Sequence, residues 1–272
     1  MNPAVATHPV TYQIDRLPPF PQVALKLYEK LQSTTSTLEE VSQILRTDTA
    51  LSAKVLKLAN SGYYSIPGGV KDVKRAFEFL GFNTIAQIVL TSSVTNLLRG
   101  SDGHAHFLKE FWRHSLGTAV AAELISKKIK RKNPSESFTT GLLHNIGKLV
   151  YLELDPEGLD SVLSQARQLE LNFDEAAIQL RKPMSSELSE MLLKQWKIPE
   201  SVWCGSAATD LVAFARHYAT WKHQGHNGDF RAVSDSLFQE ELGKLAFTNF
   251  DEKTFSEEFA VQMEKAGAFL HG

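Results

Sequence analysis

Cysteine, long hydrophobic runs and an N-terminal signal are what this sequence of 272 residues lacks or has least of. Cys204 is the single cysteine, so the chain can form neither an internal disulfide nor a zinc site of paired cysteines. No apolar stretch approaches the roughly 18 residues of a membrane span. The opening "MNPAVATHPVTYQID" lacks the basic and apolar regions of a secretory signal. These absences predict a cytoplasmic protein without a membrane partner.

An excess of charge of one sign is also missing. The 29 basic and 31 acidic residues give a formal net charge of -2, which argues against broad electrostatic attraction to nucleic acid or anionic lipid. One local basic group remains, but it lacks the interleaved aromatic residues of a nucleic-acid surface. We interpret it as a solvated helix face and expect no nucleic-acid partner. Its members are Lys54, Lys57, Lys71, Lys74 and Arg75.

Alternating strand patterns are absent, whereas apolar residues recur at helical spacing along most of the chain. Thr37 and Glu40 have the spacing of a capping box, and Asp48 is the expected N-cap of the next helix. Farther along, Gly81 is expected to end one helix and Asn83 to cap the following one. The sequence therefore predicts an all-α protein.

The composition changes near residue 100, where "RGSDGHAH" resembles a linker rather than a helix. Apolar helical patterns precede and follow this stretch, so we expect a helical region on each side of it. Residues 222–250 are the least readable part of the second region. The predicted organisation is a tail (1–16), an N-terminal helical subdomain (17–99), a linker (100–106) and a C-terminal helical domain (107–272).

Two histidines fall on the predicted inner faces of consecutive helices. His114 shares a face with Phe111, and "GLLHNIGKL" (141–149) reads as a helix with His144 and Lys148 on one stripe. A buried histidine is more often a hydrogen-bonded core residue than a metal ligand. Asn145 is neutral and residues 140–148 contain no acid, so two imidazoles alone make a poor divalent-ion site. Most other histidines, His217 and His226 among them, are predicted at the surface.

Three groups of stretches resemble the HDOD domain family, the degenerate bacterial relatives of the HD-domain metal-dependent phosphohydrolases. They are "LPPFPQVALKLYEKL"; "DTALSAKVLKLANSGYYS" with "AFEFLGFNTIAQIVL"; and "FWRHSLGTAVAAELI" with "FTTGLLHNIGKLVYLEL". They resemble the family in order and spacing, over nearly the whole chain. The resemblance implies an all-α fold in which an N-terminal bundle of short helices is packed on a C-terminal HD-like helical domain.

The resemblance also places the metal site of the active relatives on this sequence. His114 is similar to their first histidine, and His144 to the histidine of their His-Asp dipeptide, where Asn145 replaces the aspartate. Lys148 resembles a lysine that can face a phosphate in active members, so phosphate affinity could outlast the loss of metal. The resemblance thus implies a relict metal site with a possible phosphate contact.

Three further relict positions follow from the same resemblance. Ser185 and Ala208 fall where later histidines are expected, and Arg216 falls where a late aspartate would lie. An arginine in place of a ligand carboxylate repels a cation. We therefore expect no catalytic residue and no resident metal or other cofactor, with at most weak divalent binding at His114 and His144.

The resemblance implies a bacterial signalling role without catalysis. Such a regulatory protein would act through contacts with a signalling partner, or by sensing a small phosphorylated, nucleotide-like ligand in the relict cavity. The alternative is a metal-dependent phosphohydrolase that acts on a nucleotide or related phosphoester, with His114 and His144 as ligands and Asn145 as a stand-in for aspartate. Metal content and turnover would separate the two.

Overall fold

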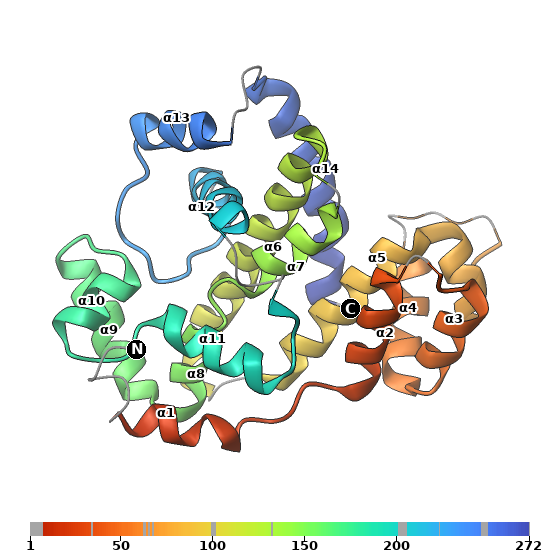
Figure 1. The fold of residues 1–272 in the computed structure, drawn as a ribbon, viewed down its shortest axis with the longest axis horizontal. Helices are drawn as coiled ribbons and strands as arrows, with labels where there is room; N and C mark the ends of the chain where they lie inside the picture. Colours follow the sequence, from red (N-terminus) through yellow and green to blue (C-terminus); the bar gives the residue numbers. More distant parts are fainter. Residues whose placement is uncertain are drawn as a thin grey trace. The chain divides into compact units, whose positions relative to one another are not determined.

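The structure is a computed structural model that describes residues 8–33, 35–61, 64, 66, 68–98, 102–131, 133–200, 206–222, 224–245 and 250–271. Every regular element in these ranges is a helix, which confirms the predicted all-α class (Figure 1). None of the described helices is both long and apolar enough to cross a lipid bilayer. The chain divides into two compact units. The first unit contains Met1–Pro19 and Leu98–Ala260, and the second contains Phe20–Leu97 and Val261–Gly272.

Local sequence signals set the helix ends of the second unit. Its helices include α2 (Gln22–Gln32), α3 (Leu38–Arg46), α4 (Thr49–Ala59) and α5 (Val73–Leu97). Thr37 and Glu40 form the predicted capping box of α3, and Asp48 caps α4 by accepting from the backbone N–H of Leu51. Gly81 has a φ of 78° and interrupts α5, which confirms the predicted break.

The first unit holds most of the helices. They are α1 (Pro9–Gln13), η1 (Ile14–Arg16), η2 (Asp102–His104), α6 (Ala105–Lys128), α7 (Pro134–Leu143), α8 (Gly147–Leu154), α9 (Pro156–Gln168), α10 (Phe173–Gln179), α11 (Ser185–Gln195), α12 (Ser206–Trp221), α13 (Asp235–Lys244) and the start of α14 (Glu252–His271). The long helix α6 packs against α7 and α12 at the centre of this unit (Figure 1). It begins at Ala105, so the last two residues of the predicted linker are helical.

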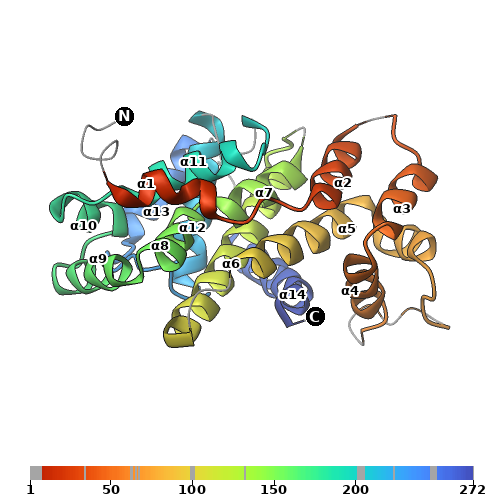
Figure 2. The ribbon, with the colours of Figure 1, turned by 90° about the horizontal axis from the view of Figure 1, so that it is seen from below.

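Residues 9–16, which belong to the predicted tail, form α1 and η1 and pack within the first unit. Helix α1 lies against α8 (Figure 2), and Val10 and Ile14 bury their side chains almost completely. Just beyond η1, the carbonyl oxygen of Pro18 accepts a hydrogen bond of 3.0 Å from the indole N–H of Trp196. Apolar burial and this hydrogen bond hold the segment in place.

Helices α8 and α11 approach closely at Gly147. The Gly147 N–H donates to Ser189 Oγ at 2.8 Å, and that hydroxyl donates to the carbonyl oxygen of Ser185, also at 2.8 Å. A Cβ atom added at Gly147 would lie 1.9 Å from the same carbonyl oxygen, which belongs to the backbone and cannot move aside alone. Only glycine allows the two helices this separation.

Gly147→Ala should therefore destabilise the protein by at least about 1–3 kcal/mol, the usual cost of overpacking a core. Gly243→Ala is the matched control, because Gly243 lies in α13 and a Cβ atom there would have no neighbour within 4 Å. In the control, the better helix propensity of alanine should leave stability unchanged or slightly raised. Urea unfolding of both variants measures the difference, and equal stabilities would contradict the close helix approach.

Candidate functional site

The stretch between α7 and α8 is a tight turn, and the predicted single helix over 141–149 is wrong. Helix α7 ends at Leu143 and α8 begins at Gly147. In between, the N–H of Ile146 donates to the Leu143 carbonyl at 3.1 Å, three residues back rather than four. The ring Nδ1 of His144 donates to the Gly141 carbonyl at 2.7 Å, and this side-chain bond supplies a carbonyl at the end of α7 with a partner.

The structure brings the two predicted histidines together. The ring centroids of His114, on α6, and His144 lie 5.7 Å apart. The Nε2 atom of His114 accepts a hydrogen bond of 3.0 Å from the Asn227 amide, because an amide nitrogen can only donate. The Nε2 atom of His144 is buried and has no hydrogen-bond partner among the described residues. The two imidazoles therefore differ: one has its lone pair occupied, and the other does not.

Both imidazoles are neutral at pH 7. Burial is the main cause that lowers the pKa of His114 well below its usual value, and the neighbouring His144 adds to this effect. Burial likewise lowers the pKa of His144 to about 3, against a smaller opposing effect of its hydrogen bond to Gly141. The nearby positive charges of Lys148 and Arg216 lower both values further.

A buried ion pair lies beside the histidines. Lys148 Nζ donates to Asp229 Oδ1 at 3.0 Å, and the exposed fractions of the two side chains are 1% and 18%. The Phe173 N–H donates to the same oxygen, and the Asn227 amide donates to Asp229 Oδ2 at 2.9 Å. Burial alone would raise the pKa of Asp229, but Lys148, Arg216 and the Phe173 N–H hold it far below its usual range. Asp229 is therefore an ionised carboxylate with several donors around it.

Asn227 and Asp229 come from a loop, Gln224–Phe230, that sequence reasoning did not resolve. The loop is pressed against α6: His226 N donates to the Glu110 carbonyl at 3.3 Å, and a Cβ atom at Gly225 would lie 2.2 Å from that oxygen. One feature of the sequence could have indicated such a loop: Lys148 is predicted on an inner face, and a buried ammonium group needs an acidic partner. Residues 140–148 offered none, so the partner had to come from elsewhere in the chain.

The other relict positions lie in different surroundings. The backbone N–H and hydroxyl of Ser185 both donate to Asp174 Oδ1 at 2.6 Å. Arg216, on α12, lies with Nη1 3.9 Å from Asp229 Oδ2. Ala208 is in the first turn of α12, and its side chain lies outside the described part of the structure. Of these three, Arg216 is the one that the structure places beside the Lys148–Asp229 pair.

Of two histidines predicted at the surface, one is largely covered and the other is exposed. His217 bonds Glu241 Oε2 through Nδ1 at 2.7 Å, and its Nε2 lies 3.1 Å from an Arg216 nitrogen. His226 is exposed, although its Nδ1 accepts from the Gly228 N–H and its ring packs on Phe230. The polar sequence context of His217 suggested exposure, but a tertiary hydrogen bond to Glu241 holds its ring inside the unit. The surface prediction was wrong for His217 and is confirmed for His226.

These side chains do not fit a divalent metal ion. Within the described ranges no three His, Cys, Asp or Glu residues lie close enough together to hold one. The lone pair of His114 Nε2 accepts from Asn227, and the carboxylate of Asp229 is neutralised by Lys148. Arg216 adds a positive charge where a metal site needs negative ones. A cation would have to break these interactions before it found enough ligands.

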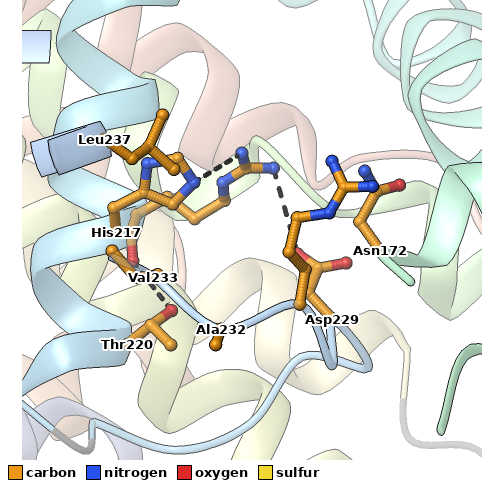
Figure 3. A pocket seen from close by; sticks show the side chains of 9 residues that line it. Asn172, His217, Thr220, Asp229, Ala232, Val233 and Leu237 are labelled. Atoms are coloured by element: carbon orange, nitrogen blue, oxygen red, sulfur yellow. Dashed lines mark hydrogen bonds and ion pairs between the residues drawn. The ribbon is translucent and has the colours of Figure 1, made fainter. Parts of the chain in front are cut away.

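A pocket of about 190 Å³ opens next to Asp229, and Arg216 and Arg231 also line it (Figure 3). His217 and Leu237 border it as well, so a polar and an apolar wall face the same space. The site thus consists of a filled region around the two histidines and an open pocket beside it. Asp229 belongs to both.

The HDOD domain model matches residues 17–209, and the chain belongs to the HDOD domain family. A solved HDOD domain protein of unknown function from Geobacter sulfurreducens is similar, with a TM-score of 0.75, 23% identity and 96% of each chain covered. A protein from Shewanella amazonensis, described as a proposed phosphohydrolase, has a TM-score of 0.71, 24% identity, and coverage of 96% of this chain and 97% of its own.

A third structure, from Marinobacter aquaeolei and described as a proposed signal transduction protein, has a TM-score of 0.73 and 18% identity, with 97% of this chain and 60% of its own covered. At these identities the structures share the fold alone. Two curated relatives, from Treponema pallidum and Bacillus subtilis, are uncharacterised, and the chain spans 37% and 31% of their length.

Proposed function

We propose that this chain is a non-catalytic regulatory HDOD protein, which acts through a signalling partner or by sensing a small phosphorylated ligand. The observation that carries the proposal is the position of the loop Gln224–Phe230. In this loop, the Asn227 amide donates a hydrogen bond to the lone pair of His114 Nε2, and the Asp229 carboxylate accepts one from the ammonium group of Lys148. Groups that a metal-dependent phosphohydrolase would use for metal and phosphate are engaged by the chain itself.

The balance of charge supports the same proposal. Asp229 is the carboxylate paired with Lys148, and it already faces the positive charges of Lys148 and Arg216. Adding a divalent cation would place three positive groups around Asp229. The neutral Asn145, at the position that resembles the aspartate of the active relatives, would offset none of this charge. The energetic cost of such an arrangement favours a site that has lost its metal.

One observation favours the alternative, a metal-dependent phosphohydrolase. The Nε2 atom of His144 and the Nδ2 atom of Asn145 are both buried without a hydrogen-bond partner in the described part of the chain. Buried polar atoms without partners are uncommon in folded proteins, and such atoms can mark the place of a ligand. Metal analysis therefore decides between the two functions.

The test is to purify the full chain without added metal and measure its manganese, iron and zinc. A phosphomonoester, a phosphodiester and nucleotides are then assayed with an excess of each metal. We expect less than one metal ion per chain and no turnover. Stoichiometric metal that His144→Ala removes, together with metal-dependent hydrolysis, would overturn the non-catalytic proposal.

Restoring the aspartate by Asn145→Asp should not create an enzyme. The new carboxylate would be buried, as Asn145 is only 7% exposed, and burial would raise its pKa so that it tends to stay protonated. We expect loose metal uptake at most, no measurable hydrolysis, and a loss of about 1–3 kcal/mol in stability. Asn133→Asp, at the exposed start of α7, is the control and should not destabilise the chain. Clear turnover by the Asn145 variant would contradict this expectation.

A further inference from the structure

The pocket beside Asp229 has the size and lining of a site for a small ligand. Helix α12 contributes Arg216 and His217, the start of α10 contributes Asn172, and the segment before α13 contributes Arg231 (Figure 3). Its volume of about 190 Å³ is below the roughly 300–1,000 Å³ of pockets that hold drug-sized ligands. A ligand of a few heavy atoms fits this space, whereas a dinucleotide does not.

Arg216 has N–H groups that can donate hydrogen bonds to such a ligand. A guanidinium group carries five N–H donors. Among the described residues, those of Arg216 make one hydrogen bond, to His217 Nε2 at 3.1 Å, and one ion pair, to Asp229 Oδ2 at 3.9 Å. The second distance is too long for a hydrogen bond. The side chain is 33% exposed, so a ligand in the pocket can reach its remaining N–H groups.

Arg231 supplies a second guanidinium group in a pair that can rearrange. It bonds Glu175 at 2.7 Å, but the exposed fractions of the two side chains are 54% and 35%. Exposed ion pairs of this kind contribute little to stability, so their partners can exchange at low cost. The Asn172 side-chain oxygen caps α10 by accepting from the Glu175 N–H, which leaves its amide nitrogen as a neutral donor at the pocket.

The charge of the pocket favours an anion. Arg216 and Arg231 line it against one acidic residue, Asp229, whose charge is already offset by Lys148 behind it. Val233 and Leu237 add apolar surface to the lining. Two planar guanidinium groups match the oxygen geometry of a phosphoryl group better than point charges do.

We propose that this pocket binds a small phosphoryl group, as inorganic phosphate or a short phosphomonoester, with Arg216 and Arg231 as paired donors. The inference rests on the proposed non-catalytic function and names the ligand class that such a regulatory protein would sense. It assigns the phosphate contact to α12 and the segment before α13, and leaves Lys148 in its pair with Asp229. Because Asp229 joins the pocket to the loop on His114, a bound phosphoryl group changes the charge next to that loop.

The experiment is calorimetric titration of the full chain in metal-free buffer. The probes are inorganic phosphate and glycerol 3-phosphate, with glycerol and acetate as ligands that lack the phosphoryl group. Phosphate and glycerol 3-phosphate should bind at one site with a Kd below about 10 mM, and glycerol and acetate should bind much more weakly. Arg216→Gln and Arg231→Gln should each weaken phosphate binding about tenfold or more, the usual effect of losing a charged hydrogen-bonding group.

Arg46→Gln is the matched control, because Arg46 forms an exposed ion pair with Glu39 and does not line the pocket. It removes the same charge and should leave the Kd unchanged. Arg231→Gln alters a half-exposed side chain, so its circular dichroism and melting temperature should equal those of the parent and keep the result interpretable if Arg216→Gln misfolds. Arg216→Lys keeps the positive charge but loses the planar guanidinium group that can donate two parallel hydrogen bonds. This variant should bind phosphate with intermediate affinity.

Three results would overturn the inference: no binding of phosphate or glycerol 3-phosphate by the parent chain, equal weakening in Arg46→Gln, or unchanged affinity in Arg231→Gln. The failure of the proposed function is a separate outcome. Hydrolysis of glycerol 3-phosphate would end the non-catalytic proposal while the binding site remained. Absence of binding would end the phosphoryl site while leaving a regulatory role through protein contacts intact.

Discussion

Lys148→Met is expected to lower the free energy of unfolding by about 3–5 kcal/mol, the cost of leaving one partner of a buried ion pair alone. Lys148 is 1% exposed and Asp229 is 18% exposed, so water replaces little of the lost interaction. The methionine fills most of the lysine volume, so the loss reports the uncompensated carboxylate rather than a cavity. Urea unfolding at pH 7 measures it.

The control for this variant is Lys194→Met, which removes a lysine from the exposed pair with Glu190 and should cost at most about 1 kcal/mol. The double variant Lys148→Met/Asp229→Asn should recover part of the loss, because the carboxylate charge is gone while the Phe173 N–H keeps an acceptor. A single variant no less stable than the control would show that the pair does not organise the site.

Much of the fold was predictable because its signals are local. The capping box of Thr37 and Glu40, the cap at Asp48 and the break at Gly81 each depend on residues within one turn of the chain. The turn at 144–146 was missed for the opposite reason. It depends on a side-chain bond from His144 to Gly141 and on the approach of α11 to Gly147, which helical periodicity does not encode.

Sequence reasoning found the two histidines of the candidate site but not the loop Gln224–Phe230 beside them. Periodicity and resemblance placed His114 and His144 on facing surfaces, and the structure brings their rings into contact. Their role as relict metal positions stays a prediction. The loop that bonds His114 and Lys148 was not predictable, because Asp229 lies 81 residues from Lys148 and its neighbours show neither helical nor strand periodicity. A loop fixed by long-range hydrogen bonds leaves no periodic pattern in the sequence.

The buried histidines should make the protein lose stability as the pH falls below about 6.5. Their pKa values in the folded chain are lowered, that of His144 to about 3, while in the unfolded chain they return to about 6.5. Between these values the unfolded chain binds protons that the folded chain does not, so stability rises with pH across this window and falls on acidification. Each histidine contributes a slope of up to about 1.4 kcal/mol per pH unit.

His144→Gln should remove one of these contributions, and the slope of unfolding free energy against pH between about 4.5 and 6 should fall by as much as about 1.4 kcal/mol per pH unit. The exposed His106 provides the control, because His106→Gln removes a side chain that water surrounds in both states. Partial burial of the exposed His226 also lowers its pKa, which adds to the slope of every variant in the same direction. The measurement is a series of urea titrations across this pH range.

Asp229 contributes little to the slope of unfolding free energy against pH in this range. Its pKa is lowered by Lys148 and Arg216, so its contribution is present above the unfolded value of about 3.9 and is lost only below it. The acid loss above pH 4.5 therefore belongs to buried neutral histidines rather than to the ion pair. If His144→Gln keeps the slope of the parent chain, the imidazole of His144 binds a proton in the folded state as readily as in the unfolded state, and the neutral, hydrogen-bonded histidines inferred for the relict site are wrong.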